Sequence, residues 1–402
     1  MDALMLPSNW QRVRLGTYKY RRGSFPQPYG NPQWYSDNGM PFVQVYDVGE
    51  NFKLTQKTKQ KISKIAQPMS VFVPKNSVII TLQGTIGRVA LTQYDCYCDR
   101  TILIFDNNTL NDVNKYFFVL SLFTKFEEEK RKADGSIIKT ITKQTLKDFE
   151  ILLPPLNEQI AIANILSTLD HYLYSLRALI LKKESVKKAL SFELLSQRKR
   201  LKGFNQAWQR VRLGTYKYRR GSFPQPYGNP QWYSDNGMPF VQVYDVGENF
   251  KLTQKTKQKI SKIAQPMSVF VPKNSVIITL QGTIGRVALT QYDCYCDRTI
   301  LIFDNNTLND VNKYFFVLSL FTKFEEEKRK ADGSIIKTIT KQTLKDFEIL
   351  LPPLNEQIAI ANILSALDHE IISLKNKKRQ FDNIKKALNH DLMSAKIRVL
   401  KK

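Results

Sequence analysis

The stretch PPLNEQIAIANILSTLD, residues 154–170, decides the fold, because it returns almost unchanged as PPLNEQIAIANILSALD at residues 352–368. Each copy ends a longer module that is identical residue for residue in both halves of the chain, so that Trp10–Ser167 recurs as Trp208–Ser365. The copies diverge at Thr168, which corresponds to Ala366. A repeat of this length indicates a duplicated domain, because the units of solenoid proteins span only about 20–50 residues.

Each copy of the quoted stretch predicts the start of a long helix. Two prolines end the preceding segment, Asn157 is a suitable N-cap, and Glu158 stands in the first turn, where the helix dipole favours an acid. Apolar residues then alternate at spacings of four and three, which is a heptad seam, and about 40 residues at ~1.5 Å each predict a rod on the order of 60 Å long. The expected seam residues are Leu166, Leu169, Leu173 and Leu176 in the first helix and Leu364, Leu367, Ile371 and Leu374 in the second.

The module itself has a mixed pattern. The runs PFVQVYDV, NSVIITLQG, GRVALTQY and TILIFD are rich in β-branched and aromatic residues, which predicts strands, and a helix is expected from Asn114. We therefore predict an α+β protein in which two identical mixed α/β modules, 1–153 and 202–351, are joined by two long helices, 154–201 and 352–402. The short linker after the first helix favours packing of the two helices as an antiparallel coiled coil over parallel packing.

The charge of the chain favours a polyanionic partner. Among 402 residues, 61 Lys and Arg stand against 36 Asp and Glu, a net charge of +25, which makes nucleic acid the leading candidate partner, although charge alone does not say which polyanion binds. No apolar run approaches the ~20 residues needed to cross a bilayer, and the N-terminus does not resemble a signal peptide, so we expect a cytoplasmic protein. The cysteine pair Cys96 and Cys98 is interpreted as buried reduced thiols, because the repeat supplies no histidine or further cysteine to complete a metal site.

Three segments of each module carry candidate DNA-binding residues. The stretch Gly16–Gly39 interleaves cations with aromatic residues and glutamines, the QGTIG turn brings backbone N–H groups close to a possible phosphate, and DGSIIKTITKQT is basic. The alternatives are an aromatic surface loop over the core, a β-turn that merely needs its glycines, and a solvated basic loop. The candidates are Lys19, Tyr20, Arg21, Arg22, Gln27, Gln44, Gln83, Thr85, Arg88, Lys139 and Lys143, with Lys217, Tyr218, Arg219, Arg220, Gln225, Gln242, Gln281, Thr283, Arg286, Lys337 and Lys341 in the second copy.

The quoted stretches, each after a module that ends in ITKQTLKDFEILL, resemble the entry into the spacer helices of type I restriction-modification specificity subunits. The segment QGTIGRVAL, at Gln83 and Gln281, resembles the Gly-x-Ile-Gly stretch of that family's target recognition domains. The order of module, helix, module and helix also matches, so the resemblance covers nearly the entire chain.

The resemblance implies a subunit that reads double-stranded DNA and whose helices form an antiparallel coiled coil. It also implies that the subunit docks two adenine methyltransferase subunits and, in a full complex, restriction subunits. Typical members carry two different recognition domains and read an asymmetric site. The two domains here are identical, so we expect one half-site read twice, as an interrupted palindrome.

The sequence argues against catalysis by this chain. His171, His369 and His390 all fall in or beyond the helices, the chain has no phosphate-binding G-x-x-x-x-G-K-[ST] loop, and no segment indicates an S-adenosylmethionine site, so no cofactor is expected. The alternative function is a non-catalytic coiled-coil adaptor with non-specific DNA affinity, which an even distribution of the positive charge would favour.

Overall fold

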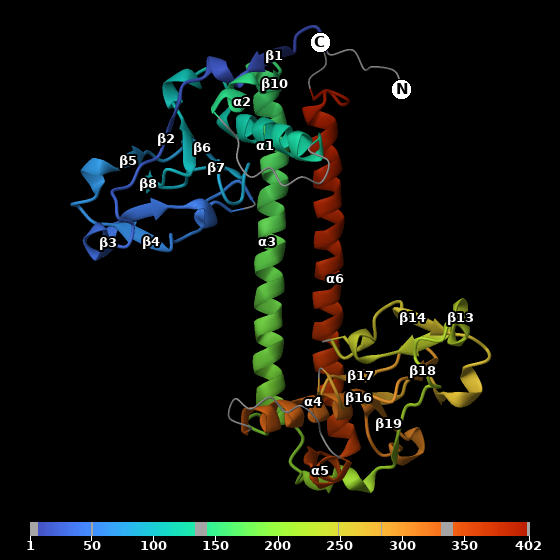
Figure 1. Ribbon diagram of the computed structural model, residues 1–402. Helices are drawn as coiled ribbons and strands as arrows, with labels where there is room; N and C mark the ends of the chain where they lie inside the picture. Colours follow the sequence, from blue (N-terminus) through green and yellow to red (C-terminus); the bar gives the residue numbers. More distant parts are fainter. Residues whose placement is uncertain are drawn as a thin grey trace. The chain divides into compact units, whose positions relative to one another are not determined.

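The structure, a computed structural model, describes residues 7–49, 51–132, 143–247, 249–282, 284–330 and 341–399. The chain divides into two compact units, unit 1 with Met1–Leu179 and Lys375–Lys402, and unit 2 with Ile180–Leu374. The division passes through both long helices. Each unit therefore contains one recognition module, the first half of the helix that follows it, and the second half of the other helix (Figure 1).

The module of unit 1 is built from two four-stranded sheets and a two-stranded pair. The first sheet has the order β2-β9-β6-β7, with β2 Tyr20–Arg22, β6 Val78–Thr81, β7 Val89–Leu91 and β9 Ile102–Phe105. The second has the order β4-β3-β8-β5, with β3 Tyr35–Val43, β4 Gln60–Ile62, β5 Val71–Val73 and β8 Cys96–Cys98. The pair joins β1 Gln11–Arg14 to β10 Glu150–Leu153. Among the described strands of this module, the pairings are antiparallel except that of β3 with β8.

The central strands β6 and β9 of the first sheet are buried on both faces. Alternate side chains of a strand point to opposite sides, so the two faces of this sheet pack against different neighbours. Ile80 and Leu103 pack with helix α1 Lys115–Lys132, whereas Ile79 and Ile104 pack with residues of the second sheet. Asn114 caps α1, since its Oδ1 accepts the Phe117 N–H at 2.9 Å. The short helix α2 Lys143–Asp148 follows.

The module of unit 2 repeats this arrangement. Its strands are β11 Gln209–Arg212, β12 Tyr218–Arg220, β13 Tyr233–Val241, β14 Gln258–Ile260, β15 Val269–Val271, β16 Val276–Thr279, β17 Val287–Leu289, β18 Cys294–Cys296, β19 Ile300–Phe303 and β20 Glu348–Leu351. Its helices are α4 Lys313–Lys330 and α5 Lys341–Asp346. None of the helices in the described part of the chain is long and apolar enough to span a bilayer.

One predicted strand ends earlier than its sequence suggested. The run PFVQVYDV was expected to be extended throughout, but β3 ends at Val43 and a 3₁₀ turn, η3 Val45–Asp47, follows. The turn forms because the Asp47 carboxylate accepts the N–H of Gln44 at 3.0 Å, which bends the chain back on itself.

The long helices are α3 Leu156–Leu195 and α6 Leu354–Met393. The prediction of Asn157 as the N-cap of α3 was wrong by two residues, because α3 begins at Leu156 and the N-cap position is Pro155. The Pro155 carbonyl already accepts the N–H groups of Glu158 and Gln159 at 2.9 and 3.0 Å, so Asn157 lies inside the first turn.

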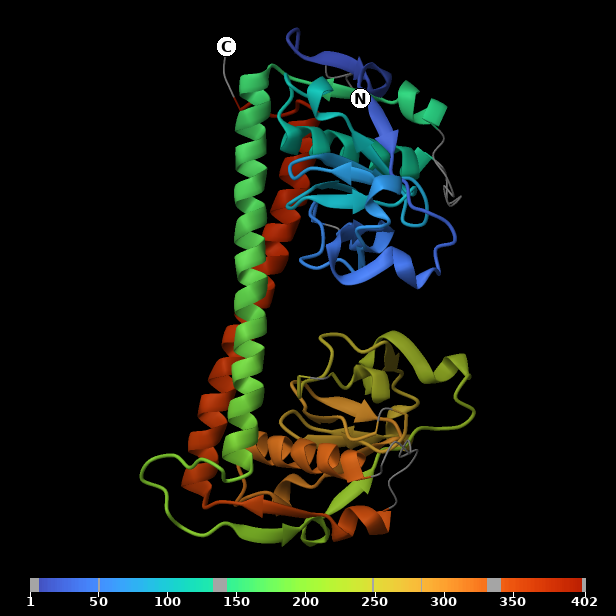
Figure 2. The same cartoon turned by 90° about the vertical axis from the view of Figure 1, so that its left-hand side faces the viewer.

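Within each unit the two helix halves are antiparallel and lie side by side (Figure 2). In unit 1, Glu158 pairs with Arg398 and Asp170 with Lys385, so the partner's number falls as the number along α3 rises. The same holds in unit 2, where Lys187 pairs with Asp368 and Arg200 with Glu356. The predicted α+β fold, with two repeated mixed domains and two antiparallel long helices, is confirmed.

The apolar seam of the helices is shared between two partners. Its first residues, including Leu166 and Leu364, belong to the cores of the recognition modules rather than only to a helix pair. The far end of the other helix completes each core, with Leu392 and Met393 in unit 1 and Leu194 in unit 2. Of the remaining seam residues, Leu173, Leu176 and Ile371 are buried, and Leu169, Leu367 and Leu374 are partly buried.

Candidate nucleic-acid interface

Three loops of the first module meet at one edge of that module's two four-stranded sheets. Because β3 and β8 are parallel, their carboxyl ends lie at the same edge, and the Asp99 N–H donates to the Val43 carbonyl at 3.0 Å. The loop after β6 joins them, since the Leu82 N–H donates to the Thr101 carbonyl at 2.9 Å. We call residues 44–49, 51–59, 82–88 and 99–101 the loop edge; its counterpart in the second module comprises residues 242–247, 249–257, 280–282, 284–286 and 297–299.

Asp47 holds the longest of these loops in place. Its carboxylate is only 1% exposed and accepts the N–H groups of Gln44 and Lys59 at 3.0 and 3.1 Å, together with the Thr55 hydroxyl at 3.4 Å. Burial raises the pKa of the Asp47 carboxyl, and these hydrogen bonds oppose the rise. The backbone on both sides of the loop is therefore fixed by one buried acid.

The side chains beside this anchor face outward. Tyr46 is 40% exposed and donates its hydroxyl to the Gln44 side-chain oxygen, while the Lys59 ammonium lies 4.3 Å from the centre of the Tyr46 ring. An amide next to an aromatic face and a cation is a set of groups that can contact a base edge and a phosphate together. The sequence had indicated Gln44, but it gave no signal for Tyr46 or Lys59, which come into place only through the Asp47 turn.

The glycine turn packs against this loop. Gly84 and Gly87 have φ of +73° and +75°, and a β-carbon on Gly87 would meet the Phe126 ring at 3.0 Å. The Arg88 guanidinium, a predicted DNA-binding group, is half-buried and donates to the Val48 carbonyl at 3.1 Å. The β-turn interpretation thus accounts for the glycines, and Arg88 joins the two loops while Gln83 and Thr85 remain exposed.

The third loop presents Arg100, which was not among the DNA-binding candidates predicted from the sequence. Tyr29 donates its hydroxyl to one oxygen of the buried Asp99, and the Thr101 hydroxyl donates to the other at 3.1 Å. Burial, and then the neighbouring Asp99 carboxylate, raise the pKa of the Tyr29 phenol, so it stays a donor. The exposed Arg100 lies with its guanidinium 5.4 Å from the centre of the Tyr29 ring.

The arginine strand β2 contacts other elements. Tyr20 packs edge-on against Phe105, with 5.7 Å between ring centres, and Arg21 donates to the Phe72 carbonyl of β5 at 3.0 Å. Lys19, Arg22 and Gln27 are exposed. The predicted set therefore divides into residues of the loop edge and residues of β2 and the turn that follows it.

The second module repeats these placements. Arg286 donates to the Val246 carbonyl at 3.1 Å, and Arg219 to the Phe270 carbonyl at 2.9 Å. Tyr218 packs on Phe303, Gln242 is half-buried, and Lys217, Arg220, Gln225 and Gln281 are exposed. The candidates Lys139, Lys337 and Thr283 lie outside the described residues, and Lys143 and Lys341 are the first residues of α2 and α5.

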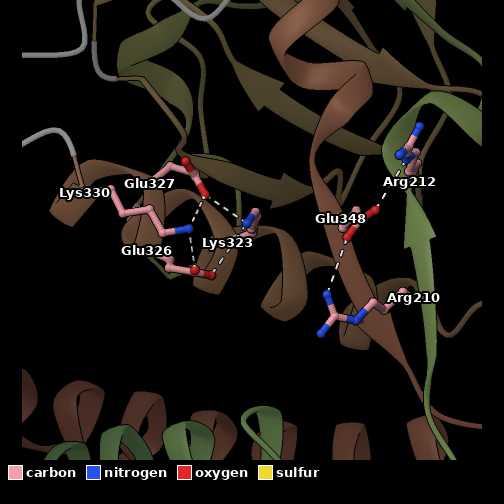
Figure 3. A network of polar contacts seen from close by, with 7 residues as sticks. All are labelled: Arg210, Arg212, Lys323, Glu326, Glu327, Lys330 and Glu348. Carbon is pink, nitrogen blue, oxygen red and sulfur yellow. Dashed lines mark hydrogen bonds and ion pairs between the residues drawn. The ribbon is translucent and has the colours of Figure 1, made fainter.

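Some basic residues away from the loop edge are neutralised by acids. On α4, Lys323 and Lys330 each contact both Glu326 and Glu327, at 2.7–3.7 Å (Figure 3). On the adjacent strand pair, Arg210 and Arg212 flank Glu348 at 3.7 and 3.4 Å. Such mixed charge does not favour a polyanion, and the contrast with Lys59 and Arg100 supports the loop edge as the candidate interface.

In the part of the chain that the structure covers, no three His, Cys, Asp or Glu side chains are grouped to hold a metal ion. Cys96 and Cys98 are buried free thiols on β8, and burial raises the pKa of Cys98.

Comparison with known proteins places this geometry in a family. Residues 26–182 and 224–381, most of the chain, match the type I restriction modification DNA specificity domain. The chain belongs to the type I restriction-modification specificity subunits. Specificity subunits are the non-catalytic, DNA-binding members of their complexes, and this one carries two target recognition domains.

Relatives support the assignment over the full length. A candidate MjaX specificity subunit of Methanocaldococcus jannaschii is 29% identical over 299 residues, which cover 70% of this chain and 68% of the relative. The MjaVIII specificity subunit of the same organism is 23% identical over 427 residues, covering 99% and 95%. The crystal structure of the type I specificity subunit from M. genitalium shares the fold, with a TM-score of 0.64 at 16% identity, covering 97% of this chain and 98% of that one.

Proposed function

We propose that each recognition domain of this specificity subunit reads DNA with its loop edge. In this proposal Gln44 and Gln83 pair with base edges, for which glutamine suits adenine, and Lys59 and Arg100 contact phosphates. Arg88 supports the loops from inside. Exposed residues of the β2 region, Lys19, Arg22 and Gln27, extend the contact along the backbone, and the counterparts in the second domain act alike.

We infer that the complete target is an interrupted palindrome. The observation that carries this proposal is the reciprocity of the two units. Arg398 of the second repeat pairs with Glu158 of the first, and Arg200 of the first repeat pairs with Glu356 of the second. Exchanging the two repeats turns one of these contacts into the other, as expected for an assembly with two-fold symmetry. Two identical recognition domains in such an assembly select the same half-site on opposite DNA strands.

The partners we propose are two adenine methyltransferase subunits and, in a full complex, restriction subunits, all in the cytoplasm. The start of each long helix exposes the same apolar pair, Leu156 with Ile160 and Leu354 with Ile358, each residue 41–43% exposed. A duplicated surface suits two copies of one partner. The methyl donor would bind to that partner. We propose residues 1–153 and 202–351 as the recognition domains and residues 154–201 and 352–402 as the spacer helices.

A genome-wide adenine-methylation map tests the function. It compares cells that express the cognate methyltransferase subunit with and without this chain. We expect one interrupted palindrome methylated on both strands. A direct repeat would refute the two-fold arrangement, and a map that does not depend on the chain would refute the specificity role.

A further inference from the structure

The longest loop of the loop edge is held at its tip by an aromatic residue in an unfavourable backbone conformation. Phe52 has a φ of +61° yet is only 7% exposed. A side chain with a β-carbon rarely adopts such a φ unless its surroundings impose it. Here the Phe52 ring packs against Tyr116 and Phe123 of α1, with 6.4 and 5.1 Å between ring centres, and its carbonyl accepts the Leu91 N–H at 3.0 Å.

The spacer helices reach this tip directly. Lys385 of α6 places its ammonium 5.3 Å from the centre of the Phe52 ring. The same ammonium pairs with Asp170 of α3, whose other carboxylate oxygen accepts the Tyr116 hydroxyl. Lys385 and Asp170 are each only 20% exposed, so the ion pair and the cation–π contact are shielded from water.

The tip is connected to the outward-facing side chains by a continuous ladder of bonds. The Gly49 N–H donates to the Lys53 carbonyl at 2.9 Å, and the Thr55 N–H donates to the Asp47 carbonyl at 2.9 Å. Asp47 in turn binds the Gln44 N–H at the far end of the loop. A displacement of Phe52 would therefore shift Gln44 and the carbonyl to which Arg88 donates.

Unit 2 repeats the device with the helices exchanged. Phe250 has a φ of +61°, and Lys187 of α3 lies 5.2 Å from its ring centre while pairing with Asp368 of α6. Tyr314 donates to the second oxygen of Asp368. The lysine that holds each loop thus comes from the helix of the opposite repeat.

We propose that Phe52 and Phe250 are positioning residues for base recognition, and that Lys385 and Lys187 fix them crosswise, each from the other repeat's helix. This inference rests on the proposed function, since the loop matters for specificity only if it contacts DNA. A merely structural role would lower stability without changing the preference for the cognate sequence.

The first experiment measures the ratio of dissociation constants for a scrambled duplex and for the duplex identified by the methylation map. We expect Phe52→Leu with Phe250→Leu to lower this ratio about tenfold, by weakening cognate binding alone. The ring-preserving pair Phe52→Tyr with Phe250→Tyr should restore it. The matched control, Phe117→Leu with Phe315→Leu, removes fully buried rings of α1 and α4 and should lower the melting temperature but not the ratio.

An unchanged ratio in the Leu pair, or an equal fall in the control, would overturn the positioning role. The proposed function itself is tested separately, because the methylation map of the unaltered chain is obtained before any variant is made.

The second experiment tests the crosswise connection by double-mutant cycles on cognate affinity. Lys385→Met and Phe52→Leu should be non-additive, with the second substitution costing several-fold less once the first is present. Lys385→Met and Phe250→Leu should be additive. Additivity in the first pair, or coupling in the second pair, contradicts the crosswise arrangement.

Discussion

Replacing Arg398 by Ala should weaken unit 1 while leaving unit 2 intact. The Glu158 carboxylate is only 2% exposed, and it receives the Arg398 Nε and Nη2 at 2.6 and 2.9 Å and the Trp10 indole N–H at 3.3 Å. Loss of the arginine leaves a buried carboxylate with the indole as a donor. Breaking a buried pair costs about 3–5 kcal/mol, and because the Arg398 side chain is 28% exposed we expect about 2–3 kcal/mol.

Hydrogen exchange measured by mass spectrometry can locate this loss. Most peptides of the two repeats are identical, but Thr168–Leu176 and Ala366–Leu374 differ and report on units 1 and 2 respectively. Since about 1.4 kcal/mol corresponds to a factor of ten, exchange in Thr168–Leu176 should accelerate about 30- to 150-fold where it proceeds through opening of the unit.

The chain supplies its own matched control, because Arg200 bonds to Glu356 in the same way. Arg200→Ala should accelerate exchange in Ala366–Leu374 and leave Thr168–Leu176 unchanged. Equal acceleration of both peptides by either variant, or of neither, would refute the assignment of the helix ends to opposite domains.

Three further predictions concern the helix ends, the loop edge and the buried tyrosines. A chain ending after Gly203 should form a homodimer of about twice its own mass in light scattering, because Leu194 and Arg200 of one copy can replace Leu392 and Arg398 in the other; a monomer would contradict this. Lys59→Met with Lys257→Met should reduce the slope of log affinity against log salt by about 2, one per lost phosphate contact, and an unchanged slope would remove Lys59 from the interface. Burial raises the pKa of Tyr94 to about 12 and of Tyr292 to about 12. The neutral phenol is therefore favoured by folding, and its contribution to stability is complete below pH ~10 and lost as the pH rises towards 12. Tyrosinate absorbance should lag in the folded chain and rise on unfolding; a single step near pH 10 would contradict the burial.

The large features of the fold could be predicted because they depend on local sequence patterns, and each pattern occurs in both repeats. The seam from Leu166 to Leu176 has helical spacing, and the β-branched runs indicate strands. The sequence also favoured antiparallel helices, since the linker was too short for the alternative. The turn at Asp47 was missed because it depends on one side chain bonding back to the Gln44 backbone rather than on any residue preference.

The candidate interface could be predicted only in part, because its members are brought together by non-local contacts. Gln44 and Gln83 carry a recognisable chemistry, but Arg100 becomes a candidate only when the parallel pairing of β3 with β8 places it beside the Tyr29 ring. Arg88 was predicted as a DNA-binding residue from its place beside the glycine turn, and its bond to the Val48 carbonyl could not be seen in the sequence. The acid at Glu158 suited a helix dipole, whereas its bond to Arg398 joins residues 240 positions apart in the sequence.

The exchange of helix ends between the repeats also affects how the chain is synthesised. The core of unit 1 includes Leu392 and Met393, so the first domain emerges from the ribosome long before the residues that complete it. The equivalent end of α3, near Leu194 and Arg200, is made much earlier and matches the same surface. On a polysome that end can belong to a neighbouring nascent chain, so the duplication that supplies two readers also favours entanglement of chains during translation.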